Sequence, residues 1–199
     1  MITEMSTIQT EKPTSFSSRN LVMAAMFAAL TLVATFVIKI QTPAFGYIHL
    51  GDAFVLLSGI VMGPALGAAA AGLGSGLADL FGGYALFAPG TMVIKFLTAL
   101  VCALLCGHLQ KKRRMGRTAS IVLSGLVAEA VMVAGYFLYN TLIICVTGSG
   151  LSHASLISAL TLSFAEIPFN IVQGTSGIIL STILAPVFLR AARVLHIAA

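Results

Sequence analysis

Five long apolar stretches, separated by short polar segments, constrain this chain more than any other feature. They run over residues 21–40, 51–82, 91–109, 118–146 and 156–189. About 20 apolar residues, coiled into an α-helix at 1.5 Å per residue, cross the ~30 Å hydrocarbon core of a bilayer. Hydrophobic residues make up 58% of the chain and charged residues only 9%, whereas a soluble domain carries roughly 25% charged residues. We therefore expect an all-α integral membrane protein with the lipid membrane around it.

The second stretch, residues 51–82, is too long for one straight span and short for two full ones. Segments rich in Lys and Arg stay in the cytoplasm, so all basic patches should share one side. An even number of crossings must then separate the patches, which requires the second stretch to cross twice. We expect a tight hairpin turning at Gly63–Pro64, and hence a bundle of six transmembrane helices with both termini cytoplasmic. The basic patches are Lys12 with Arg19, residues 111–117, and Arg190 with Arg193.

The first residues differ from the rest of the chain. Residues 1–19 are polar and rich in Ser and Thr, and they lack the basic and apolar pattern of a signal peptide. We expect a disordered cytoplasmic tail there, followed by a single membrane domain over residues 20–199. The net charge of +5 comes from the basic patches, so it reports topology and does not predict a nucleic-acid partner.

Patterns typical of catalysis or metal binding are missing from the sequence. There is no GxxxxGKS/T loop and no HExxH helix. The cysteines, Cys102, Cys106 and Cys145, lie inside apolar stretches without CxxC spacing. We therefore expect no enzyme activity, no cofactor and no resident metal. If the chain takes part in active transport, the energy must come from another subunit.

Charged residues inside the spans are the first functional candidates, because a charge in a bilayer is energetically expensive. Asp79 and Lys95 lie near the outer ends of their stretches, whereas Glu129 and Glu166 lie within theirs. The structural alternative is that these groups pair with one another and hold the bundle together. For Lys95 we give pairing and ligand contact equal weight, and Asp52 at the start of the second stretch is equally well explained as a helix cap.

Polar side chains also gather at one depth, in the outer half of the membrane. Glu166, Asn170 and Gln173 share one helical face, and Tyr136 with Asn140 occupies a similar depth on the preceding stretch. Interhelical hydrogen bonding would explain such a row. The functional hypothesis is a pocket for a small heteroaromatic ligand, with Tyr rings available for stacking. The candidate pocket residues are Asp79, Tyr84, Lys95, Tyr136, Asn140, Glu166 and Asn170.

The first stretch contains two overlapping pairs of small residues, Ala24 with Ala28 and Ala25 with Ala29. Such pairs let another helix approach closely. Packing inside this bundle is the favoured interpretation from composition, and docking onto another membrane subunit is the alternative.

Short motifs stand at residues 47–53, 78–80 and 88–91, with three dipeptide motifs near them. They resemble those of the substrate-binding S components of energy-coupling factor (ECF) transporters. The chain is most similar to the riboflavin-transporter-like branch, which includes hydroxymethylpyrimidine and pyridoxine proteins. The resemblance implies a prokaryotic plasma-membrane protein that captures a vitamin from outside and works with a transmembrane T subunit and two ATPase subunits. It also implies that the four alanines face the T subunit and that the first external loop is a lid. The motifs are residues 47–53, 63–64, 78–80, 83–84, 88–91 and 94–95.

The mixed charges and amides of the pocket candidates favour a small neutral or zwitterionic ligand. Pyridoxine or hydroxymethylpyrimidine fits best, riboflavin is a larger alternative, and an anionic folate is less favoured. Two other functions stay open. One is a stand-alone proton-coupled secondary transporter, for which Glu129 and Glu166 would carry protons. The other is a membrane enzyme or an assembly factor without a ligand.

Overall fold

In the computed structural model, the described residues are 17–42, 46–111, 115–148 and 153–195. They form five helices, each long and apolar enough to cross a membrane, which confirms the all-helical prediction. Between the first two helices, a pair of two-residue antiparallel strands occupies the predicted external loop; the sequence did not predict them. The elements are α1 (Ser18–Val37), β1 (Ile40–Gln41), β2 (Tyr47–Ile48), α2 (Asp52–Phe81), α3 (Ala88–Lys111), α4 (Arg117–Thr147) and α5 (His153–Val194).

The start of α1 bears on the predicted tail. Residues 1–16 lie outside the described residues, so the disorder expected for the tail stays a prediction. Ser18 and Arg19, which the prediction placed in the tail, already belong to α1. The hydroxyl of Ser17 caps this helix by accepting a hydrogen bond from the backbone N–H of Asn20 at 3.4 Å.

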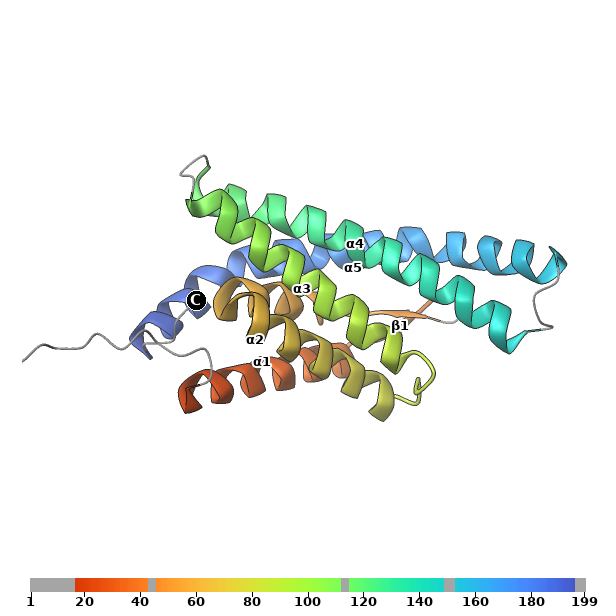
Figure 1. Cartoon of the computed structure of the whole chain (residues 1–199), viewed down its shortest axis with the longest axis horizontal. Helices are drawn as coiled ribbons and strands as arrows, with labels where there is room; N and C mark the ends of the chain where they lie inside the picture. Colours follow the sequence, from red (N-terminus) through yellow and green to blue (C-terminus); the bar gives the residue numbers. More distant parts are fainter. Residues whose placement is uncertain (1–16, 43–45, 112–114, 149–152, 196–199) are drawn as a thin grey trace, which may run out of the picture.

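α2 forms the centre of the bundle. In its most apolar window 67% of the residues are buried, against 28–39% in the other four helices. It packs against α1, α3 and α5, and Figure 1 shows it lying among them. Small residues bring the backbones close together: a Cβ added to Gly72 would lie 2.8 Å from the carbonyl oxygen of Met92 on α3. The Gly-rich sequence of α2 therefore serves tight helix packing.

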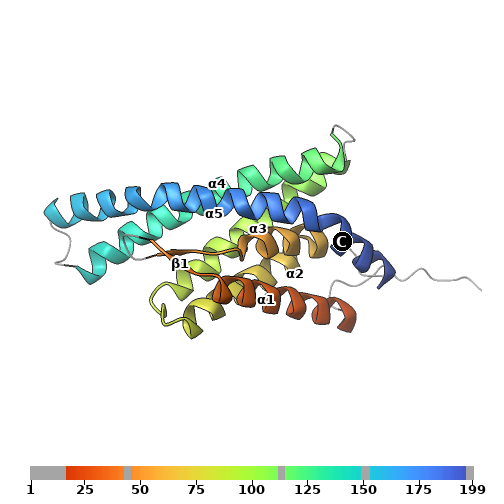
Figure 2. The same cartoon turned by 180° about the vertical axis from the view of Figure 1, so that it is seen from behind.

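α2 is broken at the predicted turn. Gly63 has φ +77° and ψ −176°, a conformation that glycine adopts readily because it has no Cβ. Pro64 follows and supplies no backbone N–H for a continuous helix. The Ser58 hydroxyl reaches the carbonyl oxygen of Gly67 at 2.9 Å, although nine residues of straight helix would span about 13 Å. Two arms of α2 therefore run back alongside each other, as Figure 2 also shows.

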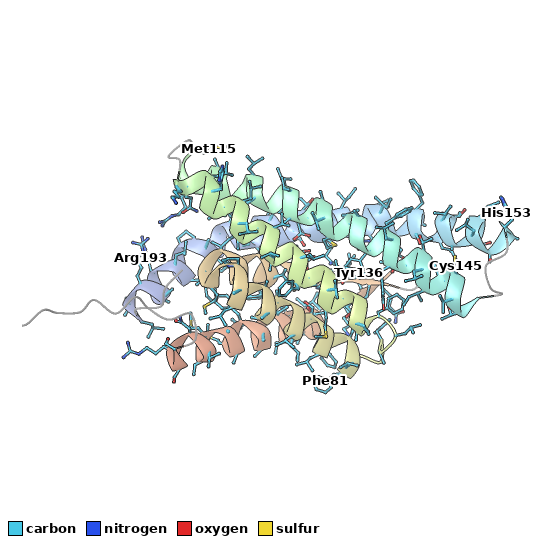
Figure 3. The ribbon with its side chains drawn as sticks, viewed as in Figure 1. Phe81, Met115, Tyr136, Cys145, His153 and Arg193 are labelled. Carbon is cyan, nitrogen blue, oxygen red and sulfur yellow. The ribbon has the colours of Figure 1, made fainter. Side chains whose placement is uncertain are left out.

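The bundle has two distinct ends. The start of α1, the end of α5 and the junction of α3 with α4 lie at one end, and the end of α4 and the start of α5 lie at the other (Figure 1). Figure 3 places Met115 and Arg193 at the first end and Cys145 and His153 at the second. α5 contains Pro168 and Pro186, and its 42 residues correspond to about 63 Å of helix.

Candidate ligand site

A polar cavity of about 50 Å³ lies between the strand β2 and the helices. It is lined by residues of α1, β2, α2, α3, α4, α5 and their connections. Six of the seven predicted pocket residues are among them, and Lys95 is not. The lining residues are Thr35, Gly46, Tyr47, His49, Asp79, Tyr84, Phe87, Thr91, Tyr136, Asn140, Glu166, Asn170 and Gln173. We call this space the polar cavity.

Strand β2 covers one side of the polar cavity and is fixed at two points. The Tyr47 hydroxyl donates a hydrogen bond to Asp79 at the end of α2. The backbone N–H of His49 donates to Gln173 Oε1 of α5 at 3.1 Å. Burial and the neighbouring Asp79 raise the pKa of Tyr47 above its ordinary value, so this phenol remains a hydrogen-bond donor. β2 therefore connects the α2 and α5 walls of the cavity.

His49 is held as a neutral acceptor. Its Nδ1 atom accepts a hydrogen bond from the backbone N–H of Gly51 at 3.0 Å. Burial lowers the pKa of His49 to about 3, because a charged imidazole would lose its hydration there. Gly51 directly precedes α2, so this contact fixes the turn between β2 and the central helix.

The opposite wall of the polar cavity comes from α4 and α5. Glu166, Asn170 and Gln173 line it from α5, as their shared helical face predicted. On α4 the Tyr136 hydroxyl donates to Thr91 Oγ1 of α3 at 3.3 Å, and Asn140 lies one helical turn further along. Carboxylate, amide and phenol groups therefore face one space from α4 and α5, which suits a ligand with several hydroxyl groups.

A second cavity, of about 400 Å³, adjoins the first. The two share Phe87, Asn140 and Glu166 as lining residues. Its remaining lining is mostly aliphatic, with Ile143 and Ile144 of α4 among it. A polar compartment and an apolar compartment thus meet at one boundary, and this arrangement suits an amphipathic ring compound. We call the second space the apolar chamber.

Lys95 lies outside the lining of the polar cavity. It forms a buried ion pair with Asp52 of α2. Neither side chain is exposed to solvent. Gln173 Nε2 donates to the second oxygen of Asp52 at 2.8 Å, and the Lys95 ammonium lies 5.2 Å from the centre of the Tyr136 ring. The structure therefore gives Lys95 the structural pairing that the sequence left as one of two alternatives. Lys95 is connected to the cavity lining by two contacts: its ammonium lies against the Tyr136 ring, and its partner Asp52 accepts a hydrogen bond from Gln173.

Glu129 lies outside the polar cavity as well. Glu129 is only 5% exposed. Within the described part of the chain, neither of its carboxyl oxygens has a hydrogen-bond partner. A Cβ added to Gly174 of α5 would lie 3.0 Å from Glu129 Oε2, so the two helices pack tightly here. This carboxyl group belongs to the α4–α5 interface.

Sequence reasoning did not select several of the lining residues. Tyr47 and His49 stand in the motif that carries the resemblance, but a loop motif does not reveal which helix ends the loop will cover. Thr35 and Thr91 are ordinary residues of apolar stretches, Phe87 belongs to the loop between two of them, and no signal in the sequence distinguishes these three. Gln173 belonged to the polar row on α5, so its position follows from helical periodicity.

The four alanines of α1 divide into two pairs. Ala25 and Ala29 are exposed on the surface of the bundle, whereas Ala24 and Ala28 are partly buried. The latter two pack against the hydrophobic core, and a Cβ added to Gly74 of α2 would lie 3.0 Å from the Cα atom of Ala28. Each interpretation of the small-residue pattern thus applies to one pair: internal packing to Ala24 and Ala28, and an available surface to Ala25 and Ala29.

Five apolar helices around a buried polar cavity define a class, that of multi-pass membrane proteins with a site for a small solute. Residues 15–190 match the family model described as "ECF-type riboflavin transporter, S component". The chain belongs to this family, which means that it is the substrate-binding subunit of a vitamin transporter and not an enzyme.

The chain is also similar to a sequence relative and to a solved structure. The chain is 33% identical over 150 residues to a Pyrococcus woesei protein described as an uncharacterized protein in the gap 3′ region, covering 74% of this chain and 86% of the relative. It also resembles the solved structure of the S component of a bacterial ECF transporter, with a TM-score of 0.56 and 22% identity, over 88% of this chain and 96% of the other. That second likeness supports the fold.

Proposed function

We propose that this protein captures a hydroxylated heteroaromatic vitamin from outside the cell, for ATP-driven uptake through a T subunit and two ATPase subunits. The observation that carries the proposal is the polar cavity, around which six predicted residues from four segments gather. Such convergence in a membrane domain calls for a polar occupant, because unpaired polar groups facing an apolar interior are unfavourable.

The two joined compartments narrow the ligand. Asp79, Glu166 and Asn170 provide acceptors and donors for hydroxyl groups, while the Tyr84 and Tyr136 rings offer faces for stacking. The apolar chamber next to them suits an aromatic ring system. Riboflavin combines a large ring with a hydroxylated chain, and the matching family model bears its name. We therefore place riboflavin first, and pyridoxine and hydroxymethylpyrimidine, which the sequence favoured, after it.

Lys95 has an indirect role in this proposal. Its ammonium lies under the Tyr136 ring, and its partner Asp52 accepts a hydrogen bond from the cavity residue Gln173. The ion pair therefore fixes the positions of two side chains that line the polar cavity. We propose that Lys95 positions the site and that Asp79, Tyr84, Tyr136, Asn140, Glu166 and Asn170 contact the ligand.

The experiment is to purify the full chain in detergent without added vitamin and to identify bound compounds by mass spectrometry. We expect one flavin, pyridine or pyrimidine at close to one molecule per chain. Asn170→Ala should lose it, whereas Thr175→Ala, an exposed position on the same helix, should keep it. An empty protein that also fails to bind riboflavin, pyridoxine and hydroxymethylpyrimidine in calorimetry would refute the capture function.

We propose six membrane crossings with both termini in the cytoplasm. The close contact between Ser58 and Gly67 supports two crossings by the arms of α2, and the grouping of Met115, Arg193 and the start of α1 at one end supports a common cytoplasmic side. The proposed membrane is a prokaryotic plasma membrane. A cysteine introduced at Ala65, which is exposed beside the turn, should react only with reagents that reach the cytoplasm, and labelling from outside would contradict this topology.

We propose that the α1 face with Ala25 and Ala29 docks onto the T subunit, with Ala24 and Ala28 at the edge of that contact. The support is the exposure of the first two alanines on a helix whose other small residues are packed inward. Ala25→Leu with Ala29→Leu should reduce co-purification of the T subunit and leave vitamin binding intact.

One observation favours a second candidate, the proton-coupled secondary transporter. Glu129 is buried, and its carboxyl oxygens have no hydrogen-bond partner in the described part of the chain; an ionisable side chain inside a membrane span is a candidate for proton transfer. Uptake by the chain alone in proteoliposomes, driven by a pH gradient and lost in Glu129→Gln, would favour this candidate over the ECF module.

A further inference from the structure

Lys39 follows α1 directly and is absent from the lining of the polar cavity. We infer that Lys39 is a positioning residue that holds strand β2 closed over the polar cavity and thereby sets the rate at which ligand leaves. The inference rests on the proposed capture function, because it assigns a role in the closing of that same site.

The Lys39 ammonium faces three aromatic rings from three segments. Its Nζ atom lies 4.8 Å from the centre of the Phe36 ring on α1, 4.5 Å from that of Tyr47 on β2 and 5.4 Å from that of Tyr84 in the α2–α3 connection. A cation within about 6 Å of a ring centre is attracted by the ring face. One ammonium therefore connects the end of α1, the covering strand and the far end of α2.

Tyr47 is held from two directions at once. Its ring faces Lys39, and its hydroxyl donates to the Asp79 carboxylate. The Tyr47 and Tyr84 rings also pack together, with their centres 4.9 Å apart. Tyr47, Asp79 and Tyr84 all line the polar cavity. Lys39 therefore stabilises cavity residues from the outside, without occupying the space that a ligand would take.

The backbone leaves room for this ammonium. Gly82 ends α2 with φ −80°, and a Cβ added there would lie 2.8 Å from the backbone carbonyl oxygen of Ala78, closer than Cβ atoms come. A Cβ added there would overlap the Lys39 Nζ atom. Glycine at this position therefore leaves room for both the carbonyl group and the Lys39 ammonium.

Opening of the cavity on this side must separate β2 from its partners. Movement of β2 would break the Tyr47–Asp79 hydrogen bond, the His49–Gln173 hydrogen bond and the Lys39–Tyr47 contact. Asp79 and Gln173 also face the ligand space, so changes there alter binding contacts as well. Lys39 can be changed without replacing any residue that lines the cavity, so its variants keep the groups that would bind the ligand.

The first experiment measures closure without any ligand. A cysteine at Asn170 reports access to the polar cavity through its reaction rate with a charged methanethiosulfonate, and the native cysteines are buried. In the full chain in proteoliposomes, Lys39→Met should speed this reaction roughly five- to thirtyfold, from the loss of cation–π contacts. Lys39→Arg should stay near the parent rate, because a guanidinium also binds ring faces. Lys111→Met, at the exposed end of α3, is the matched control.

An unchanged reaction rate in Lys39→Met would overturn the inference. If that variant does not fold, Lys39→Gln, which also lacks the positive charge, replaces it: faster labelling supports the role of Lys39, and a parental rate contradicts it.

The second experiment uses riboflavin as the probe, followed by stopped-flow fluorescence. Lys39→Met should raise the dissociation rate roughly five- to thirtyfold and leave the association rate within about twofold. A loss confined to association would contradict the positioning role. If the wild-type chain does not bind riboflavin, that form of the capture function fails, while the cysteine reaction still decides the role of Lys39.

Discussion

Two polar groups in this bundle lie next to each other and differ in how their side chains are satisfied. Asp52 and Lys95 are fully buried and neutralise each other, with Gln173 completing the hydrogen bonding of the carboxylate. In the polar cavity, Tyr84, Asn140 and Asn170 are only half-buried and face open volume. The first group is complete within the protein, whereas the second has capacity for further hydrogen bonds. A charge inside a span is therefore a signal of importance, and packing decides whether that importance concerns folding or binding.

The largest effect should come from breaking the complete group. Lys95→Met leaves the Asp52 carboxylate buried without its counter-ion, and removing one partner of a buried ion pair typically lowers the free energy of unfolding by about 3–5 kcal/mol. Thermal unfolding in detergent would measure this loss. The double variant with Asp52→Asn should recover most of it. Wild-type stability with lost vitamin binding would instead place Lys95 among the ligand contacts.

The next largest effect should be a loss of vitamin affinity when a residue of the polar cavity is changed. Asp79→Asn keeps the shape of the side chain but removes the charge that accepts the Tyr47 hydrogen bond. Hydrogen bonds to charged groups contribute about 1.5–3 kcal/mol, so vitamin affinity should fall roughly 10- to 150-fold. Calorimetry measures the affinity, and thermal unfolding serves as the control. A variant that unfolds as readily as Lys95→Met would erase the distinction between the two groups.

A pH series tests the connection between the polar cavity and the Asp52–Lys95 ion pair. His49 lines the cavity, and its backbone N–H donates to Gln173, which also donates to Asp52. The pKa of His49 is about 3 in the folded protein and 6.5 in the unfolded chain. Between these values the unfolded chain binds a proton that the folded chain excludes. The contribution of His49 to the free energy of unfolding is therefore complete above pH 6.5. It decreases by about 1.4 kcal/mol per pH unit on acidification towards pH 3.

His49→Asn should remove this slope while keeping an acceptor for the Gly51 N–H. Unfolding at pH 7.5 and pH 5.0 compares the two proteins, and other titrating groups contribute equally to both. An equal loss of stability in the wild type and in His49→Asn would show that His49 does not carry the acid sensitivity.

The smallest effect should come from Tyr136, which stands at the boundary of the two groups. Tyr136→Phe removes the long hydrogen bond to Thr91 but keeps the ring above Lys95. One such neutral bond contributes about 1 kcal/mol, so both stability and affinity should change little. Calorimetry would show a larger loss of affinity only if the ligand contacts the Tyr136 hydroxyl in addition to the ring.

The helices and the wall of the site on α4 and α5 could be predicted from the sequence, because both depend on local periodicity. Apolar length determined the five stretches, and the spacing of Glu166, Asn170 and Gln173 placed them on one face. The break at Gly63–Pro64 followed from the positions of the basic patches.

The cover of the cavity could not be predicted in the same way. Tyr47 reaches Asp79, 32 residues away in sequence, through a loop that returns over the helix ends, and neither residue has a periodic pattern that announces the contact. The pairing of Lys95 was also undecided, since four carboxylates were available to it. Tertiary packing selected Asp52, which the sequence had equally explained as a helix cap.

Pro168 stands in α5 between Glu166 and Asn170 of the ligand wall. Because proline has no backbone N–H, the carbonyl group of Phe164 lacks its usual helical donor. A bend at this turn therefore breaks no further backbone hydrogen bond, and sharp bends in helices occur mainly at such positions. The α5 wall of the ligand site thus contains one turn, between Glu166 and Asn170, that is held by fewer backbone hydrogen bonds than the rest of the helix.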